Sequence, residues 1–160
     1  MNRTTIRVAR WELDVERDAT REAYEATAPG VRCDCYDCQN FVRLGRDVFT
    51  ADYHKILESL GIDYRMPAEL CHYTRLESGL HHYGGWYHFI GKILSGDDSY
   101  RPVDASRTGW TIETEPIAGA AEIGFSDRHD LALDRLAGHS LVQVDIDVKL
   151  PWIIEGFESD

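Results

Sequence analysis

Positively charged side chains are scarce in this sequence, and long apolar stretches are missing. The 160 residues include 17 Lys or Arg against 28 Asp or Glu, which gives a formal net charge of -11. Such a chain repels phosphate backbones, and no basic stripe offsets the repulsion, so we expect no nucleic-acid partner. No stretch approaches the ~18 apolar residues of a membrane span, and the N-terminus shows no apolar core of signal-peptide length. We therefore expect a cytoplasmic protein without a membrane partner, whose thiols stay reduced.

Familiar catalytic motifs are also missing. No G-x-S-x-G, H-E-x-x-H or G-x-G-x-x-G pattern occurs, and nothing in the sequence pairs a nucleophile with a base. The sequence therefore leaves open whether the protein is an enzyme. With 43% hydrophobic and 11% aromatic residues, the chain has ample material for a core, and its length suits a single domain over residues 1–160.

Hydrophobic periodicity predicts an α+β fold. The clearest strand is 141–150, where four β-branched residues alternate with four polar ones, a pattern typical of one buried and one solvated face. Apolar residues at helical spacing predict a helix over 50–60, capped by Thr50 and ended by Gly61. The other expected elements are strands at 4–14, 69–76, 81–88, 110–115 and 121–125, a polar loop at 95–109, and a short helix or loop at 15–30. These elements predict one mostly antiparallel sheet with one or two packed helices.

Three of the four cysteines, Cys33, Cys35 and Cys38, lie within six positions in the spacing C-x-C-x-x-C. Thiolates at this spacing in a tight loop can point at a common centre, as tetrahedral zinc requires. The fourth ligand does not follow from the spacing, because no second C-x-x-C occurs. Cys71 or one of the seven histidines would have to complete the site through the fold. We predict a structural zinc site held by Cys33, Cys35 and Cys38, with Cys71 or a histidine as the fourth ligand.

Other interpretations of the cysteine cluster remain open. Free cysteines are often buried as small apolar side chains, although three in six positions is denser than that interpretation expects. A redox pair formed by Cys35 and Cys38 would favour a motif that opens a helix inside a βαβ unit, and no such unit precedes it. An iron–sulfur cluster normally takes four thiolates.

A histidine-rich stretch between residues 69 and 88 is expected to form a hairpin with a two-residue turn at 78–79. The turn sets a register that pairs Glu69 with His88, Cys71 with Trp86, Tyr73 with Gly84, and Arg75 with His82. An aromatic ring over a glycine is a known packing device in sheets. A bulge at 84–85 would turn the last part of the second strand to the opposite face.

This register gathers convergent polar groups around an aromatic side chain on one face of the hairpin. Such a composition is typical of a small-molecule site. The candidate ligand-binding residues are Glu69, Arg75, His82, Trp86 and His88. Alternatively, the face is simply solvated, because cross-strand pairs of this kind also stabilise a sheet without any ligand.

The motif C-x-C-x-x-C-x-N-F, which runs from Cys33 to Phe41, occurs together with three further short motifs. They are "ILESLGID" at 56–63, "GGWYHF" at 84–89 and "LPW" at 150–152. With this set the chain resembles a family of small bacterial proteins of uncharacterised activity. The resemblance covers most of the chain and implies a single domain and a bacterial origin. It implies no activity.

The sequence therefore predicts a module that binds an unknown small molecule or protein and carries structural zinc in its cysteine loop. The alternative is a small enzyme that uses the His, Glu and Arg side chains of the 69–88 hairpin. Metal content separates the first hypothesis from an interpretation as plain thiols.

Overall fold

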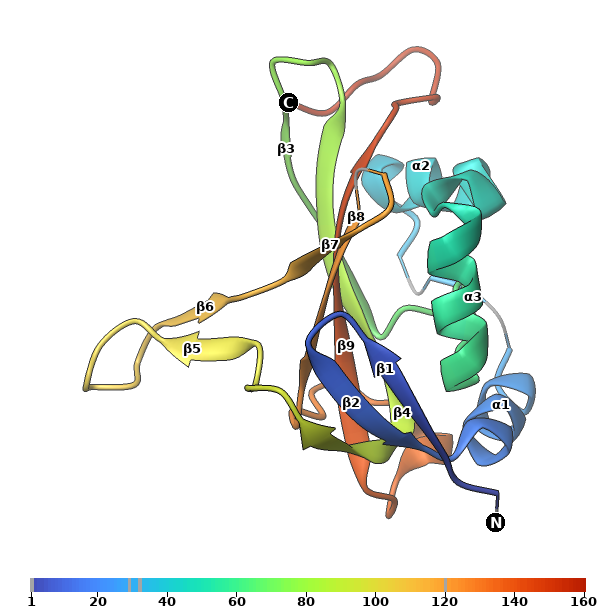
Figure 1. The fold of residues 1–160 in the computed structure, drawn as a ribbon. Coiled ribbons are helices and arrows are strands. Elements are labelled where there is room, and N and C mark those ends of the chain that lie inside the picture. The colour runs from blue at the N-terminus through green and yellow to red at the C-terminus, as the bar shows by residue number, and fades with distance from the viewer. Residues whose placement is uncertain (1, 29, 32, 120) are drawn as a thin grey trace.

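The computed structural model describes residues 2–160 except 29, 32 and 120. The main sheet has seven strands in the order β1-β2-β4-β9-β8-β7, with β3 paired to β4 outside this path (Figure 1). The strands are β1 (Thr4–Val8), β2 (Trp11–Val15), β3 (Glu69–Arg75), β4 (His81–Ser95), β7 (Glu115–Ile117), β8 (Ala121–Ser126) and β9 (Leu141–Leu150). Their described pairings are all antiparallel. A separate two-stranded sheet pairs β5 (Tyr100–Pro102) with β6 (Trp110–Ile112).

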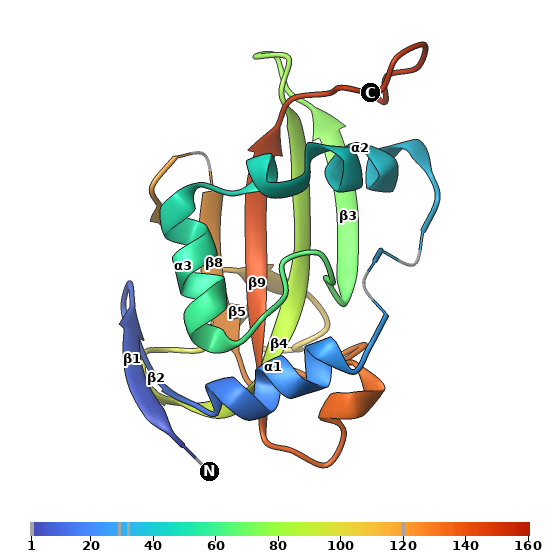
Figure 2. The same cartoon turned by 90° about the vertical axis from the view of Figure 1, so that its right-hand side faces the viewer.

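Three α-helices cover one face of the sheet (Figure 2). They are α1 (Arg17–Glu25), α2 (Tyr36–Leu44) and α3 (Ala51–Leu60), with short 3-10 turns at η1 (Gly45–Val48) and η2 (Asp134–Leu136). The predicted α+β class is thus confirmed. The helix at the cysteine loop is the element that the periodicity did not predict.

The helix predicted over 50–60 is present as α3. The Thr50 side chain accepts a hydrogen bond from the backbone N–H of Tyr53, which satisfies one free donor of the first turn. Gly61 ends the helix in the left-handed conformation, with φ of 80°. A Cβ atom at Gly61 would lie 2.3 Å from the carbonyl oxygen of Arg17, so the glycine also lets α1 approach α3 closely.

Side-chain alternation along the strands decides which residues form the core. Tyr87 of β4, Val144 of β9 and Phe125 of β8 lie opposite one another in register, and each is fully buried. Burying a side chain of this size contributes roughly 1.5–3 kcal/mol. The Tyr87 hydroxyl also donates to the carbonyl of Tyr64, just after α3, at 2.7 Å. Packing onto the sheet therefore stabilises helices that are too short to persist alone.

Two of the strand predictions differ from the structure. The strand expected at 4–14 is a hairpin, because the chain turns at Ala9 with φ of 49° and β1 pairs with β2. A positive φ is uncommon for alanine, so the sequence carries no strong turn signal there. The strand expected at 110–115 is divided between β6 and β7, and the expected loop at 95–109 contains β5.

The hairpin register predicted for 69–88 is wrong. Glu69 pairs with Trp86, and Cys71 pairs with Gly84. The register shifts between His72 and Thr74, because Tyr73 forms a bulge in β3, whereas the glycines 84–85 of β4 form none. The Tyr73 ring does lie over Gly84, where a Cβ atom would be 2.3 Å from its hydroxyl oxygen.

The face of the sheet away from the helices is called the far face below. It carries alternate residues of β4 and β9, among them His88 opposite Gln143 and Trp86 opposite Asp145. The sequence predicts a solvated face here, but Gln143 is 0% and Asp145 3% exposed. The segment that leads into β5 covers them, and its Ser99 hydroxyl donates to Asp145 at 3.3 Å.

Candidate metal centre

The cysteine loop ends where helix α2 begins. Cys35 is the N-cap, with extended backbone angles of φ -65° and ψ 161°, and Cys38 is the third residue of the helix. Side chains at these two positions of a helix start lie next to each other. The start of α2 therefore brings the side chains of Cys35 and Cys38 together. Cys33 joins them, because the backbone N–H of Cys35 donates to its Sγ at 3.5 Å.

The three sulfur atoms lie within 4.8 Å of one another. Tetrahedral zinc with bonds of ~2.3 Å to sulfur separates its thiolates by roughly 3.8 Å, so small side-chain movements would close the site around an ion. Cys33 and Cys35 are exposed, whereas Cys38 is buried. Among the residues that the structure describes, no further His, Cys, Asp or Glu belongs to this group.

The thiols of this cluster differ in how readily they ionise. The pKa of Cys33 is lowered by the hydrogen bond from the Cys35 backbone N–H, and further by bonds from the thiols of Cys35 and Cys38. Burial raises the pKa of Cys38 far above its ordinary value. The positive end of α2 favours negative charge on the cluster. A metal ion would take three deprotonated thiols, so its binding must weaken as the pH falls.

Helix α2 is fixed to the sheet by hydrogen bonds to backbone groups. The buried Asn40 amide donates to the carbonyl of Pro151 at 3.1 Å and accepts from the N–H of Ile153 at 2.8 Å. The Tyr83 hydroxyl donates to the carbonyl of Asp37 at 3.0 Å. The cysteine cluster therefore lies at the start of a helix that buried hydrogen bonds hold in position.

Cys71 lies apart from the cluster. It pairs with Gly84, while its neighbour His72 pairs with Tyr83, and the Tyr83 hydroxyl bonds to α2. Because side chains alternate across a strand, Cys71 points to the far face, away from α2. The pKa of its thiol is raised by burial and then by the nearby charge of Glu69. Cys71 therefore does not join the other three expected ligands. The sequence does not determine which face of a distant strand a residue occupies.

A cleft with a volume of about 780 Å³ adjoins the cysteine cluster, and Cys33 and Cys38 both line it. Its other walls are the segment that follows α1, residues 66–68 with the first two residues of β3, and the segment 131–134. A volume of this size is typical of pockets for small molecules. The cluster therefore faces a space in which a ligand could approach a bound metal.

Of the five predicted ligand-binding residues, one lines this cleft and a second supports one of its walls. Glu69 lines it directly. The Trp86 ring nitrogen donates to the carbonyl of Asp130 at 2.9 Å and so ties the segment before 131–134 to the sheet. Trp86 therefore supports a wall of the cleft.

The other three predicted residues are dispersed. Arg75 pairs with His81 across the hairpin and forms an ion pair with Glu158 at 3.2 Å, so it does not share the face of His82. His82 bonds to Asp147 at 2.6 Å. His88 is 1% exposed on the far face. The face predicted from the sequence is therefore not a single site, because the bulge at Tyr73 separates Arg75 from the rest.

The sequence did not single out a histidine pair on the helix side of the sheet. His72 Nε2 and His81 Nδ1 are 2.9 Å apart, and His81 Nε2 lies 3.0 Å from Glu158 Oε1. Since a carboxylate only accepts, His81 donates to Glu158 and, when neutral, accepts from His72. Burial lowers the pKa of His72. The alternation along both strands is the sequence signal that could have found this pair, because it places His72 and His81 on the same face of the hairpin.

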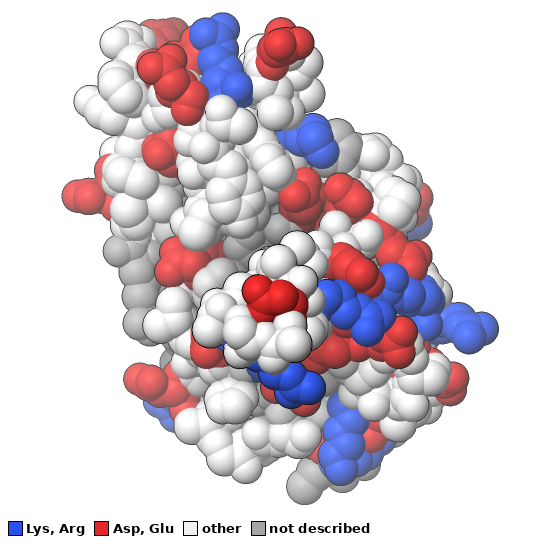
Figure 3. All heavy atoms as spheres, turned by 90° about the vertical axis from the view of Figure 1, so that its left-hand side faces the viewer, with Lys and Arg blue, Asp and Glu red and all other residues white. Residues whose placement is uncertain are grey.

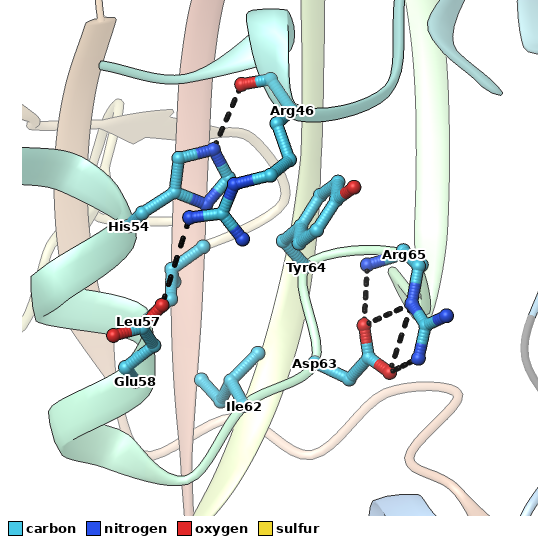
Figure 4. A pocket seen from close by; sticks show the side chains of 8 residues that line it. All are labelled: Arg46, His54, Leu57, Glu58, Ile62, Asp63, Tyr64 and Arg65. Atoms are coloured by element: carbon cyan, nitrogen blue, oxygen red, sulfur yellow. Dashed lines mark hydrogen bonds and ion pairs between the residues drawn. The ribbon is translucent and has the colours of Figure 1, made fainter. Parts of the chain in front are cut away.

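A second hollow, of about 360 Å³, lies between α3 and the segment that follows it (Figure 4). Arg46 faces Glu58 at 3.7 Å, and Arg65 pairs with Asp63 at 2.5 Å. His54 donates to the carbonyl of Arg46 at 2.8 Å. The charges in this hollow are balanced by their neighbours, so it is a weaker candidate for a ligand than the cleft beside the cysteines.

Comparisons with protein-family models, with curated proteins and with solved structures gave no match. Within the described part of the chain, no helix is both long and apolar enough to cross a membrane. The functional argument therefore rests on the geometry of the cysteine cluster and its cleft.

Proposed function

We propose that this protein binds one zinc ion through Cys33, Cys35 and Cys38 and that it acts as a binding module. The observation that carries the proposal is the convergence of three sulfur atoms within 4.8 Å at the start of α2. Thiolates are soft ligands that select zinc over hard cations such as magnesium. The ion would fix the loop before α2 and leave its fourth position toward the cleft.

The proposal is tested by elemental analysis and native mass spectrometry of protein purified without a chelator. We expect about one zinc per chain. Cys35→Ser should release the metal and lower the melting temperature, whereas Cys71→Ser should retain it, because Cys71 lies on the far face. Protein that carries no metal and whose four thiols all react freely with a thiol reagent would refute the proposal.

Thiol–disulfide exchange is the second candidate function. It is favoured by the lowered pKa of Cys33 and by a C-x-x-C pair that opens a helix. In that case the metal-free protein would form a reversible disulfide within the cluster, and Cys38→Ser would abolish it. A full zinc complement in reduced protein favours the metal site instead.

The same proposal places the protein in a reducing compartment such as the cytoplasm, where thiols remain available for metal. We also propose that nucleic acid is not a partner, and the charge distribution supports this. Basic side chains on the far face lie among acidic ones (Figure 3), and the net charge is -11. Neither arrangement attracts a phosphate backbone.

A further inference from the structure

The cysteine cluster supplies three ligands from the chain, and tetrahedral zinc takes four. Sites with three protein ligands keep their fourth position for water or for a substrate. Here Cys33 and Cys38 line the 780 Å³ cleft, so the fourth position is reached from that side. A ligand in the cleft can therefore bind the metal directly.

The chemistry of the cluster selects the group that would fill this position. Three thiolates are soft donors and leave a divalent ion with a net charge of about -1. Such a centre is a weak acid toward water and prefers a further soft donor. Sulfur is the softest donor that common metabolites carry, so the ligand is expected to present a thiol.

The walls of the cleft select the rest of the ligand. Two carboxylates, Glu69 and Asp134, line it, and none of its described lining residues is Lys, Arg or His. Together with the anionic metal centre, they favour a positive charge on the ligand. Most of the other lining is apolar, with Met66, Leu70 and Leu133 among it. An aliphatic segment fits such a surface.

From these observations we propose that the cleft binds a small aminothiol, whose sulfur takes the fourth position on the metal and whose ammonium group faces Glu69 and Asp134. This inference rests on the metal site proposed above. It names the class of ligand that the binding module recognises. The cleft is also large enough for an aliphatic chain between the two charged ends.

The test uses the full chain loaded with cobalt(II), whose visible absorption bands report the number and type of its ligands. Cysteamine, mercaptoethanol and mercaptoacetate carry the same thiol with a positive, a neutral and a negative partner group. We expect cysteamine to shift the bands saturably and to bind about tenfold more tightly than mercaptoacetate. In Glu69→Gln/Asp134→Asn this preference should fall to about twofold or less.

A matched control is Glu77→Gln, which removes an exposed carboxylate at the hairpin turn and should keep the preference. Melting curves establish that each variant folds. If cobalt gives no thiolate bands, the metal site itself is refuted. If the thiolate bands form but no thiol alters them, or if all three thiols bind equally, the metal site stands and the aminothiol proposal fails. Loss of cobalt to the added thiol would also overturn the proposal.

Discussion

Buried histidines on the two sides of the sheet are held in different ways. On the helix side, His81 is 0% exposed and bonds to both His72 and Glu158. On the far face, His88 lies opposite Gln143, whose side chain raises the pKa of His88 against the larger effect of burial, yet neither ring nitrogen makes a well-formed hydrogen bond within the described residues. A buried polar atom without a partner costs roughly 1–3 kcal/mol. His81 therefore gains stability from its partners, while the burial of His88 costs some.

Ser126 is a second buried polar residue of the far face without a hydrogen-bond partner among the described residues. It lies opposite Gln143 on the other side of β9, and the Ser126 hydroxyl and the Gln143 carbonyl oxygen also have no partner in the described chain. Asp145, two residues along β9, instead accepts hydrogen bonds from Ser99, Tyr100 and Gln143. The far face thus combines one satisfied carboxylate with a row of unsatisfied groups.

The largest effect is expected from His81→Ala. The substitution opens a cavity on the helix side and removes a hydrogen-bond partner from both His72 and Glu158, so it should lower the free energy of unfolding by roughly 2–4 kcal/mol. Denaturant titration measures the change. His82→Ala is the matched control, because its partly exposed pair with Asp147 should be worth less than about 1 kcal/mol. Equal losses in the two variants would contradict the contrast between the faces.

A pH effect of similar size is expected on the far face. Burial raises the pKa of Asp145 to about 6 in the folded protein, above its ordinary value of 3.8. Its contribution to stability is therefore full below pH ~4 and is lost as the pH rises through ~6, which amounts to about 3 kcal/mol. Relative to Asp145→Asn, the wild-type protein should lose this amount between pH 4 and 7. A constant difference in unfolding free energy over that range would refute the assignment.

The pKa of His88 moves in the opposite direction. Burial lowers it to about 4 from 6.5, so stability is lost as the pH falls from ~6.5 to ~4. The two groups therefore compensate one another in the wild-type protein between pH 4 and 6. Relative to His88→Leu, the wild-type protein should therefore lose stability as the pH falls from ~6.5 to ~4, which denaturant titrations at several pH values measure.

The smallest effect is expected from His88→Leu at pH 7. The substitution replaces two unpaired buried nitrogens with an apolar side chain, so stability should stay within about 1 kcal/mol of wild type or rise. Thermal melts at this pH measure the change. A loss above about 2 kcal/mol would show that His88 has an energetically important partner.

Local sequence signals predicted the parts of the molecule that local geometry determines. Cys33, Cys35 and Cys38 meet because neighbouring positions at a helix start are close in space, and α3 begins at its Thr50 cap. The spacing of the cysteines is therefore sufficient to predict the cluster. It did not predict α2 itself, since a run of polar residues with three cysteines is equally typical of a loop.

Positions set by the tertiary structure could not be predicted in the same way. The faces of Cys71 and Arg75 depend on strand pairing and on one bulge at Tyr73, and a shift of a single residue reverses a face. The burial of Gln143 and Asp145 depends on the segment that crosses the far face, far away in the sequence. The alternation of residues within β9 does not show that another segment buries its polar face.

The hydrogen bonds that hold α2 against the sheet depend on the side chains of some residues and only on the backbone of others. The Asn40 amide bonds to the backbone of Pro151 and Ile153, and the Tyr83 hydroxyl bonds to the backbone of Asp37. The Asn40 amide also donates to the Tyr83 hydroxyl at 3.4 Å. Backbone groups persist whatever side chain they carry. Substitutions at Asp37, Pro151 and Ile153 that keep the backbone in place therefore preserve these hydrogen bonds, whereas the position of the cysteine loop depends on the side chains of Asn40 and Tyr83.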